Sequence, residues 1–410
     1  MGEITIKTKK ALLLAVICLS LMIKMAGQGN IRLRVNPDQA TGGTTSEIFQ
    51  ELNYIPLETT KESLFGKIDQ LYVTDSFFIV LDYDINAILL FYKNGRFHCK
   101  IEGGSESRSY HPLGIQAFFV DRERGEISYK LGETRTLVYN FNGKKLRDEN
   151  VIRSRFYYIF PNNETVFFYF NSNEKTNKEE SSNELVWQRN GQIYQTALPY
   201  TFKNPVISTS DWVYKNGTPF YEGGNDSTVF YTRPFDYTIY QITPKSFSQK
   251  YSFLFPAAYS LPVDFRTKQE YYGKRFLLLR EKYNKSIVAV TNFNKVDETI
   301  CFSLFGLTNS KNNTFFYNLE SEKLLSLDHI SPEKANNFLP LKSDFGFTGI
   351  HTTDGKYFYL SVSSTDMFAS KSINSKKQLK YPEIINTYFK KGSKNDNPVI
   401  IQLKIKSTIK

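Results

Sequence analysis

Arginine, tyrosine and histidine lie close together in one short segment, at Arg108, Tyr110 and His111. A guanidinium offers a planar fork for a carboxylate, and a phenol ring offers an aromatic face for a sugar or a peptide. These are the most chemically varied neighbours in the chain, so we take them as candidate binding residues. The competing interpretation is a loop whose side chains form only local hydrogen bonds.

A second group imitates the opening of a calcium-binding loop, with Asp82, Asp84 and Asn86 at alternate positions. Such a loop needs glycine at its sixth position for a sharp turn and a bidentate glutamate at its twelfth. Ala87 and Lys93 occupy those positions. We therefore expect no calcium site here, and we expect Asp82 to cap the turn after a strand.

The histidines and cysteines form no recognisable metal or nucleophile motif. The four histidines are not at metal-ligand spacing from one another, and the H-E-x-x-H, C-x-x-C and G-x-S-x-G patterns do not occur. We predict no metal and no cofactor. Paired carboxylates on separate strands could still act as acid and base in glycan cleavage, and such pairs are invisible in a sequence.

The elements that must position these residues are strands. Phe77 to Leu81 and Ala87 to Tyr92 are nearly continuous apolar runs, and Asn94-Gly95 follows them. Asn-Gly favours a two-residue hairpin turn of type I′, in which both residues have positive φ. Antiparallel strands that are apolar on both faces belong to a small sheet covered on both sides.

This unit recurs along the chain. Asn-Gly appears again with Gly143 and Gly191, so that Gly95, Gly143 and Gly191 are each 48 positions apart, although Asn216-Gly217 breaks the series. A repeat of roughly four short strands is the size of a propeller blade. We predict an all-β, six-bladed antiparallel β-propeller, with five or seven blades as alternatives because the second half drifts from the repeat.

The ends of the chain suggest how the ring closes. A strand within Ile48 to Leu57 is expected to join the last blade, beside a final strand from Val399 to Lys406, because closure removes an exposed sheet edge. The predicted organisation is a signal peptide over 1–27, a linker over 28–46 and one propeller over 47–410. Insertions are expected near 171–183, 256–272 and 365–395, the last with a helix over Pro382 to Lys391.

The first residues have the layout of a secretory signal peptide. Lys7, Lys9 and Lys10 precede an apolar run of 13 residues, which is short of the roughly 20 needed to span a bilayer. We expect export to the periplasm or the cell surface, with no transmembrane span in the mature chain. Lipidation at Cys18 is a weaker alternative, because bulky Ile17 precedes it where such sites have glycine or alanine.

The other two cysteines, Cys99 and Cys301, fall in different predicted blades. Two cysteines in an exported chain of this size are no disulfide framework. We expect both thiols to be free.

The formal net charge of +11 is concentrated near the two ends. Residues 1–24 hold four lysines and one acid, and residues 371–410 hold ten lysines and two acids, so the remaining residues are neutral overall. Phosphate binding needs a distributed basic face, so we expect no nucleic-acid partner. The basic tail could touch anionic lipid or glycan, although a solvated lysine-rich segment is the commoner explanation.

The first repeat is similar to that of a known family. Ile79-Val80-Leu81-Asp82, Asn86, Asn94-Gly95 and Phe97 resemble the NHL-type propeller repeat, and so does the connector with Gly103-Gly104, Pro112, Gly114-Ile115 and Val120-Asp121. With the YIPLETT start and the Asp396-Asn397-Pro398 lead into the last strand, the chain resembles the exported bacterial "6-bladed beta-propeller" family of unknown function. Ser105 to Ser109 replace a more glycine-rich stretch of that family. The resemblance implies a fold but no catalytic residues.

These observations favour a non-catalytic ligand-binding or protein-interaction module of the cell envelope. Its partner would be a glycan, a peptide or a protein, bound at the central mouth of the ring beside Arg108, Tyr110 and His111. The alternative is a glycan-acting enzyme, a glycoside hydrolase or lyase, with its site at the same mouth.

Overall fold

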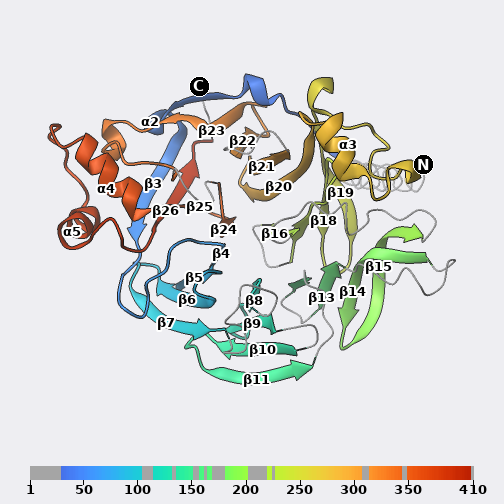
Figure 1. Cartoon of the computed structure of the whole chain (residues 1–410), viewed down its shortest axis with the longest axis horizontal. Coiled ribbons are helices and arrows are strands. Elements are labelled where there is room, and N and C mark those ends of the chain that lie inside the picture. The colour runs from blue at the N-terminus through green and yellow to red at the C-terminus, as the bar shows by residue number, and fades with distance from the viewer. Residues whose placement is uncertain are drawn as a thin grey trace, which may run out of the picture.

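Six small antiparallel sheets stand in a ring in the computed structural model (Figure 1). This confirms the predicted six-bladed β-propeller. The structure describes residues 29–103, 114–131, 135–150, 157–160, 164–168, 181–201, 219–223, 227–306, 314–343 and 349–407. The predicted signal peptide, most of the 171–183 insertion and the segment with Arg108, Tyr110 and His111 lie outside these ranges.

The first three blades are four-stranded meanders in chain order. Blade one consists of β4 (Gln70–Val73), β5 (Phe77–Asp82), β6 (Ala87–Tyr92) and β7 (Phe97–Glu102). Blade two consists of β8 (Phe118–Asp121), β9 (Glu126–Leu131), β10 (Arg135–Asn140) and β11 (Lys145–Asn150). Blade three consists of β12 (Tyr157–Ile159), β13 (Thr165–Phe168), β14 (Ser181–Arg189) and β15 (Gln192–Thr201).

The last three blades include strands from the start of the chain. Blade four consists of β16 (Phe220–Glu222), β17 (Val229–Tyr231), β18 (Thr238–Ile242), β19 (Phe247–Leu254) and the added β1 (Ile31–Arg34). Blade five consists of β20 (Ile287–Val296), β21 (Thr299–Gly306), β22 (Thr314–Asn318), β23 (Leu324–Ser331) and the added β2 (Thr41–Thr44). Blade six consists of β24 (Thr352–Thr353), β25 (Phe358–Val362), β26 (Val399–Ile405) and β3 (Phe49–Pro56).

The ring is closed by the two ends of the chain, as the sequence predicted. Strand β3 pairs with β26 in antiparallel register from Val399 opposite Pro56 to Ile405 opposite Phe49. The strand from the start of the chain thus becomes the outermost strand of the last blade. This pairing satisfies a sheet edge that would otherwise be open.

The segment before this strand differs from the expected polar linker over 28–46. Strand β1 adds in parallel to β19, and β2 adds in parallel to β23, so the segment covers the outer edges of blades four and five. Leu33 and Val35 are buried there among the side chains of both blades. Alternating apolar residues, as in Ile31-Arg32-Leu33-Arg34, are the half-buried strand pattern that the linker interpretation overlooked.

The repeated Asn-Gly turns differ in part from the predicted type I′ geometry. At Asn190-Gly191 both residues have positive φ, as type I′ requires. At Asn94-Gly95 only Gly95 does, with φ of +85°, and its N–H donates to the carbonyl of Tyr92. The prediction was therefore wrong at Gly95: the register shifts between Leu90 and Phe91, and the extra residue makes a longer turn that ends in a bulge.

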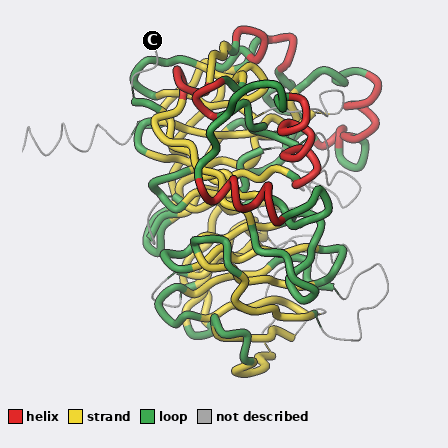
Figure 2. Tube along the Cα trace, turned by 90° about the vertical axis from the view of Figure 1, so that its left-hand side faces the viewer, coloured by secondary structure: helices red, strands yellow, loops and turns green. Residues whose placement is uncertain are grey.

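Successive connections of a meander alternate between its two ends, so the ring has two unlike faces. The second-to-third-strand and blade-to-blade connections share one face, which we call the connector face. The other connections share the turn face. The connector face carries α3 (Arg275–Glu281), α4 (Ser364–Ile373) and α5 (Glu383–Lys391), the last close to the predicted helix. Figure 2 shows most helical segments on one side of the disc, opposite the C-terminus.

The remaining helical turns are short and lie outside the blades. They are η1 (Pro37–Gln39), α2 (Thr45–Ile48), η4 (Ala257–Tyr259), η5 (Gln269–Tyr271) and η6 (Lys334–Asn336). A capping box at Thr44 and Glu47 begins α2 just before the closing strand.

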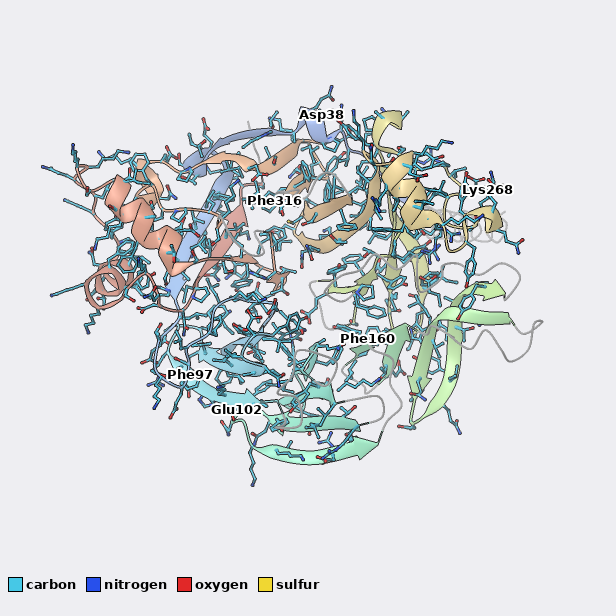
Figure 3. The ribbon with its side chains drawn as sticks, in the orientation of Figure 1. Asp38, Phe97, Glu102, Phe160, Lys268 and Phe316 are labelled. Atoms are coloured by element: carbon cyan, nitrogen blue, oxygen red, sulfur yellow. The ribbon has the colours of Figure 1, made fainter. Side chains whose placement is uncertain are left out.

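The core lies between neighbouring blades. Apolar side chains from two adjacent sheets meet in most of the described clusters, for example Phe316 of blade five with Phe358 of blade six at a ring-centroid distance of 5.8 Å. Figure 3 shows Phe316 inside the ring and Lys268 and Asp38 at its periphery. Because each sheet is covered on both faces, inner strands such as β5 and β6 are nearly continuous apolar runs, whereas the outer strand β11 is charged.

Replacing Gly95 by alanine should lower the free energy of unfolding more than replacing Gly191. Both residues have φ near +80°, so both substitutions carry a backbone penalty of about 1–2 kcal/mol. A Cβ at Gly95 would lie 2.1 Å from the carbonyl oxygen of Pro56, whereas nothing lies within 4 Å of a Cβ at Gly191. We expect a further loss on the order of 1–3 kcal/mol for Gly95→Ala in urea unfolding. Equal losses would contradict the docking of this turn on the closing strand.

Cys99 and Cys301 are both free, as predicted, and should differ in reactivity. Cys301 is fully buried, and burial raises the pKa of the half-buried Cys99 thiol to about 11. The native protein should therefore modify slowly at Cys99, at a rate that rises with pH well beyond 9, because only the thiolate reacts. Thiol titration of the denatured, unreduced chain without residues 1–27 should find both groups. A rate that levels near pH 8.5 would contradict the burial of Cys99.

Candidate functional site

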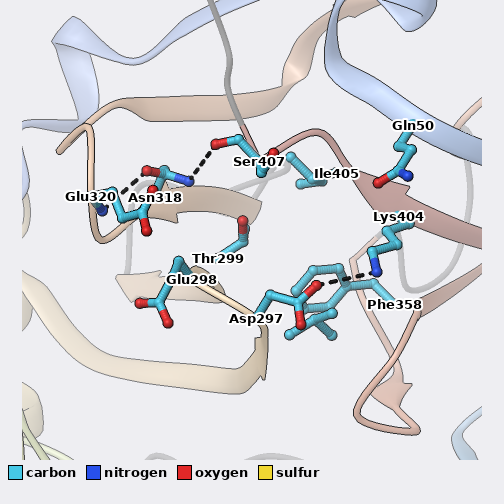
Figure 4. Close-up of a pocket in the computed structure, with 11 residues that line it drawn as sticks. Gln50, Asp297, Glu298, Thr299, Asn318, Glu320, Phe358, Lys404, Ile405 and Ser407 are labelled. Carbon is cyan, nitrogen blue, oxygen red and sulfur yellow. Dashed lines mark hydrogen bonds and ion pairs between the residues drawn. The ribbon is translucent and has the colours of Figure 1, made fainter.

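The described residues enclose a pocket of about 280 Å³ on the turn face, between blades five and six. We call it the interblade pocket (Figure 4). It is formed by the β20–β21 and β22–β23 turns, the end of β26 and the start of β3. Its lining residues are Gln50, Val296, Asp297, Glu298, Thr299, Asn318, Glu320, Phe358, Lys404, Ile405 and Ser407.

Two tight turns present the polar side chains of the pocket. Val296 pairs with Thr299, which leaves Asp297 and Glu298 as a two-residue loop, and Asp297 has a φ of +48°, a conformation that aspartate tolerates. In the next turn the buried Asn318 side chain accepts hydrogen bonds from the N–H groups of Glu320 and Ser321 at 3.1 and 2.8 Å. Both turns are thereby fixed before any ligand binds.

The pocket carries more negative than positive charge. Lys404 Nζ lies 3.2 Å from a carboxylate oxygen of Asp297, and the Asn318 amide donates to the carbonyl of Ser407. Glu298 and Glu320 add two further carboxylates. Carboxylates accept hydrogen bonds and lysine and amide groups donate them. The pocket can therefore bind a ligand that carries several hydroxyl or amine groups.

The residues predicted from the sequence, Arg108, Tyr110 and His111, lie outside the described part of the chain. The structure describes the two ends of their connector. Gly103 donates its N–H to the carbonyl of Asn86, and Ile115 donates to the Asn86 side chain at 2.8 Å. The connector therefore starts and ends on Asn86, on the connector face and away from the interblade pocket.

The channel at the centre of the ring is bridged near the turn face. Arg122 follows β8 of blade two and donates to Glu222 of blade four at 3.1 Å and to the hydroxyl of Tyr72 of blade one at 2.8 Å. Burial, reinforced by the nearby Glu222, raises the pKa of Tyr72 well above its ordinary value, so its phenol stays protonated. Side chains of blades one, two and four thus meet across the turn-face end of the channel.

Lys93 and Tyr359 join blade one to blade six on the turn face. The ammonium lies 4.4 Å from the ring centroid of Phe78 and 3.2 Å from the Tyr359 oxygen, and that hydroxyl donates to Asp354 at 2.6 Å. Burial lowers the pKa of Lys93 to about 8, while Asp354 opposes this shift. Cation–π contact with the two aromatic rings opposes this effect of burial, because it favours the charged ammonium. The same contacts hold blade one against blade six.

Asp82 caps a turn, as predicted, and its carboxylate is fully committed. One oxygen accepts from the N–H groups of Gly66 and Lys67, and the other accepts from those of Asp84 and Ile85. Among the described residues, no three histidine, cysteine, aspartate or glutamate side chains are placed to hold a metal ion.

The described histidines bond to protein groups. His98 contacts the Asn142 side chain, His329 contacts the carbonyl of Ala40, and His351 lies 2.8 Å from the hydroxyl of Ser361. Burial lowers the pKa of His351 to about 3, so it is neutral at physiological pH. These contacts assign the described histidines to structural positions.

A buried ionic cluster fastens the connector face between blades three and four. Glu184 of β14 accepts from Tyr231 at 2.6 Å, from Arg266 at 2.7 Å and from Arg233 at 3.1 Å. Arg266 comes from the segment between β19 and β20, so the cluster ties that segment to two blades. Arg233 also pairs with Asp236 at 2.6 Å.

No local sequence pattern pointed to the interblade pocket or to the buried ionic cluster. The pocket residues Asp297 and Lys404 stand at the ends of strands that were identified correctly, but they are far apart in the chain. Glu184 stands in a strand, and Arg266 stands in an insertion that was identified only as an insertion. Only the order of blades in the closed ring brings each pair together.

Replacing Glu184 by glutamine should lower the free energy of unfolding by about 3–5 kcal/mol near neutral pH, because it leaves the buried Arg266 guanidinium without its ion-pair partner and Arg233 with Asp236 alone. Burial alone would raise the pKa of Glu184, but Arg266 and Arg233 hold it below its ordinary 4.5. The stabilisation is therefore complete above pH 4.5 and is lost as the pH falls below that value. Urea unfolding from pH 7 to pH 3 measures it, with exposed Glu123→Gln as control. A difference independent of pH would contradict this role.

Comparison with known proteins supports the fold. A family profile, Domain of unknown function (DUF4934), matches residues 29–404. A search of curated proteins finds no match. A crystal structure of a protein named as exported, from Bacteroides fragilis NCTC 9343, is 16% identical with a TM-score of 0.66, covering 92% of this chain and 99% of that one.

A second structure, a member of the DUF4221 family from Bacteroides vulgatus ATCC 8482, is 11% identical with a TM-score of 0.44, covering 88% of this chain and 98% of that one. The profile and the Bacteroides fragilis structure agree with the predicted resemblance to exported six-bladed propellers of unknown function. Because the profile spans nearly all of the ring, the chain belongs to the family described as Domain of unknown function (DUF4934).

Proposed function

We propose that this protein is an exported, non-catalytic binding module of the cell envelope and that it holds a glycan in the interblade pocket. The observation that carries this proposal is the convergence of donors and acceptors from two blades on one concavity of about 280 Å³. Binding sites are typically concave, largely preformed and lined by a few well-placed polar groups.

The chemistry of the lining favours a polyhydroxylated ligand. Each sugar hydroxyl both donates and accepts a hydrogen bond, so it needs partners of both kinds. Asp297, Glu298 and Glu320 supply acceptors, while Lys404 and Gln50 supply donors. The excess of carboxylates disfavours an acidic ligand and suits a neutral or amino sugar.

The remaining parts of the proposal rest on the sequence and on the relative. The basic residues and apolar run near the start have the layout of an export signal, and the Bacteroides fragilis structure is of a protein named as exported. Among the described residues, no helix is long and apolar enough to cross a membrane. Asp297 is already engaged by Lys404 in an ion pair, which favours binding over acid and base chemistry.

A glycan array should identify the ligand, and variants should locate it. Asp297→Asn keeps a residue that tolerates positive φ but removes the charge, and loss of a charged hydrogen bond should weaken binding about tenfold or more. Glu123→Gln, in an exposed turn of blade two on the same face, is the matched control and should leave the affinity unchanged. Isothermal titration with the best glycan measures both.

Other outcomes assign the function differently. Unchanged affinity in Asp297→Asn together with loss in Arg108→Ala would move the site to the connector face. Formation of a cleaved product during incubation would establish the glycoside hydrolase or lyase instead of a binding module.

A further inference from the structure

Exposed apolar side chains are distributed unequally between the two faces of the ring. Of the twelve large hydrophobic residues that are exposed in the described part of the chain, seven lie in connections of the connector face and none lies in a turn of the turn face. The seven are Leu64, Ile85, Val263, Phe276, Leu277, Ile373 and Ile384.

Five of these residues, including the two most exposed, Val263 and Ile373, belong to two helical insertions. Val263 is fully exposed, and Phe276 and Leu277 of α3 are about half exposed, at 46% and 50%. The side chain of Arg275 is buried and donates to the carbonyls of Phe265 and Arg266, which fastens the loop after Val263 to α3. These three apolar residues are therefore held in one rigid insertion that packs on blades four and five.

The second insertion is the α4–α5 pair of blade six, where Ile373 is 81% exposed and Ile384 is 44% exposed. Met367 and Ile385 pack into the core and hold both helices against the sheet. In the sequence, the lysines of residues 371–410 suggested a basic tail. Most of these lysines lie in this insertion, between β25 and β26, and only the last of them follow the final strand. These lysines therefore lie on the folded α4–α5 insertion.

Both insertions are strongly basic. Residues 255–286 contain seven lysines and arginines against three acids, and residues 363–398 contain seven lysines against three acids. In the second insertion six of the lysines are exposed, and none of those six makes an ion pair with a described residue. Acidic neighbours on the elements concerned are Asp264, Glu270 and Glu281 in the first insertion and Asp366, Glu383 and Asp396 in the second.

We propose that the connector face docks on an anionic lipid bilayer through these two insertions. Exposed apolar side chains beside lysines are the combination that inserts shallowly into the boundary of a membrane while the cations meet anionic headgroups. In Figure 1 the insertions lie on opposite sides of the ring, and both lie on the connector face. A flat, extended anionic surface is the partner that can meet both at once.

Docking through the connector face would leave the turn face exposed to solvent. The interblade pocket, with three carboxylates and one lysine in its lining, lies on the turn face. The bilayer proposal does not depend on what that pocket binds. It also differs from a lipid anchor at Cys18, because it uses only folded parts of the propeller.

Co-sedimentation with vesicles tests the proposal. The full mature protein should bind vesicles of phosphatidylglycerol and phosphatidylcholine, release at high salt, and bind poorly to phosphatidylcholine alone. Each lysine near an anionic surface strengthens binding about fivefold, so Lys376→Gln, Lys380→Gln and Lys394→Gln together should weaken it on the order of a hundredfold. The matched control neutralises three exposed lysines of the turn face, Lys144, Lys245 and Lys356, and should bind normally.

A second variant separates a bilayer from another polyanion. Phe276→Ser with Leu277→Ser keeps all charges and should weaken vesicle binding at least tenfold, and circular dichroism and thermal unfolding check that the variant keeps its fold. If soluble polygalacturonate binds as tightly as the vesicles, and the serine variant binds both normally, the partner is an acidic polysaccharide and the bilayer proposal is overturned. Equal weakening in the turn-face control, or equal binding to neutral vesicles, also overturns it.

Discussion

The pairing of β3 with β26 is the interaction on which the rest of the structure depends. A ring of sheets has no exposed edge only when its first and last strands meet, and here the seven residues of β26 lie between β25 and a strand from the start of the chain. Neighbouring groups reinforce the junction. Asn397, just before β26, donates to the carbonyls of Glu58 and Ser63 and accepts from the N–H of Phe65. The Gly95 turn of the first blade packs against Pro56, at the end of β3.

The meander of each blade divides the molecule into a face of short turns and a face of long connections. The turns are limited by the packing of one blade on the next, as the hydrogen bond from the Cys99 thiol of blade one to the carbonyl of Phe141 in blade two illustrates. The connections on the other face are free to vary in length, and they carry α3, α4, α5 and the buried Glu184–Arg266 pair. Chemical variety therefore concentrates on the connector face, whereas the interblade pocket arises where two turns and two strand ends fail to fill the space between blades.

Features encoded by a few neighbouring residues were predicted correctly, whereas features with weak or ambiguous local patterns were missed. The Asn-Gly turns, the apolar strands and the closing strand indicated the blades because each of these signals is contained in a few consecutive residues, and the turns recur every 48 positions in the first three blades. The two short strands β1 and β2 were missed because four-residue edge strands carry little pattern of their own. The turn at Gly95 was assigned the wrong type because Asn-Gly fits both a two-residue turn and a longer one with a bulge.

The sequence by itself determined the fold class, the closure of the ring and the separation of Cys99 from Cys301, and it favoured six blades over five or seven. These properties follow from strand periodicity and turn residues, which act over short distances. Tertiary structure alone decided that Asp297 faces Lys404, that Glu184 meets Arg266, and that the lysines of α4 and α5 share a face with Phe276. The reason is that a closed ring sets blades five and six, or three and four, side by side, and that placement leaves no mark in the local pattern of either strand.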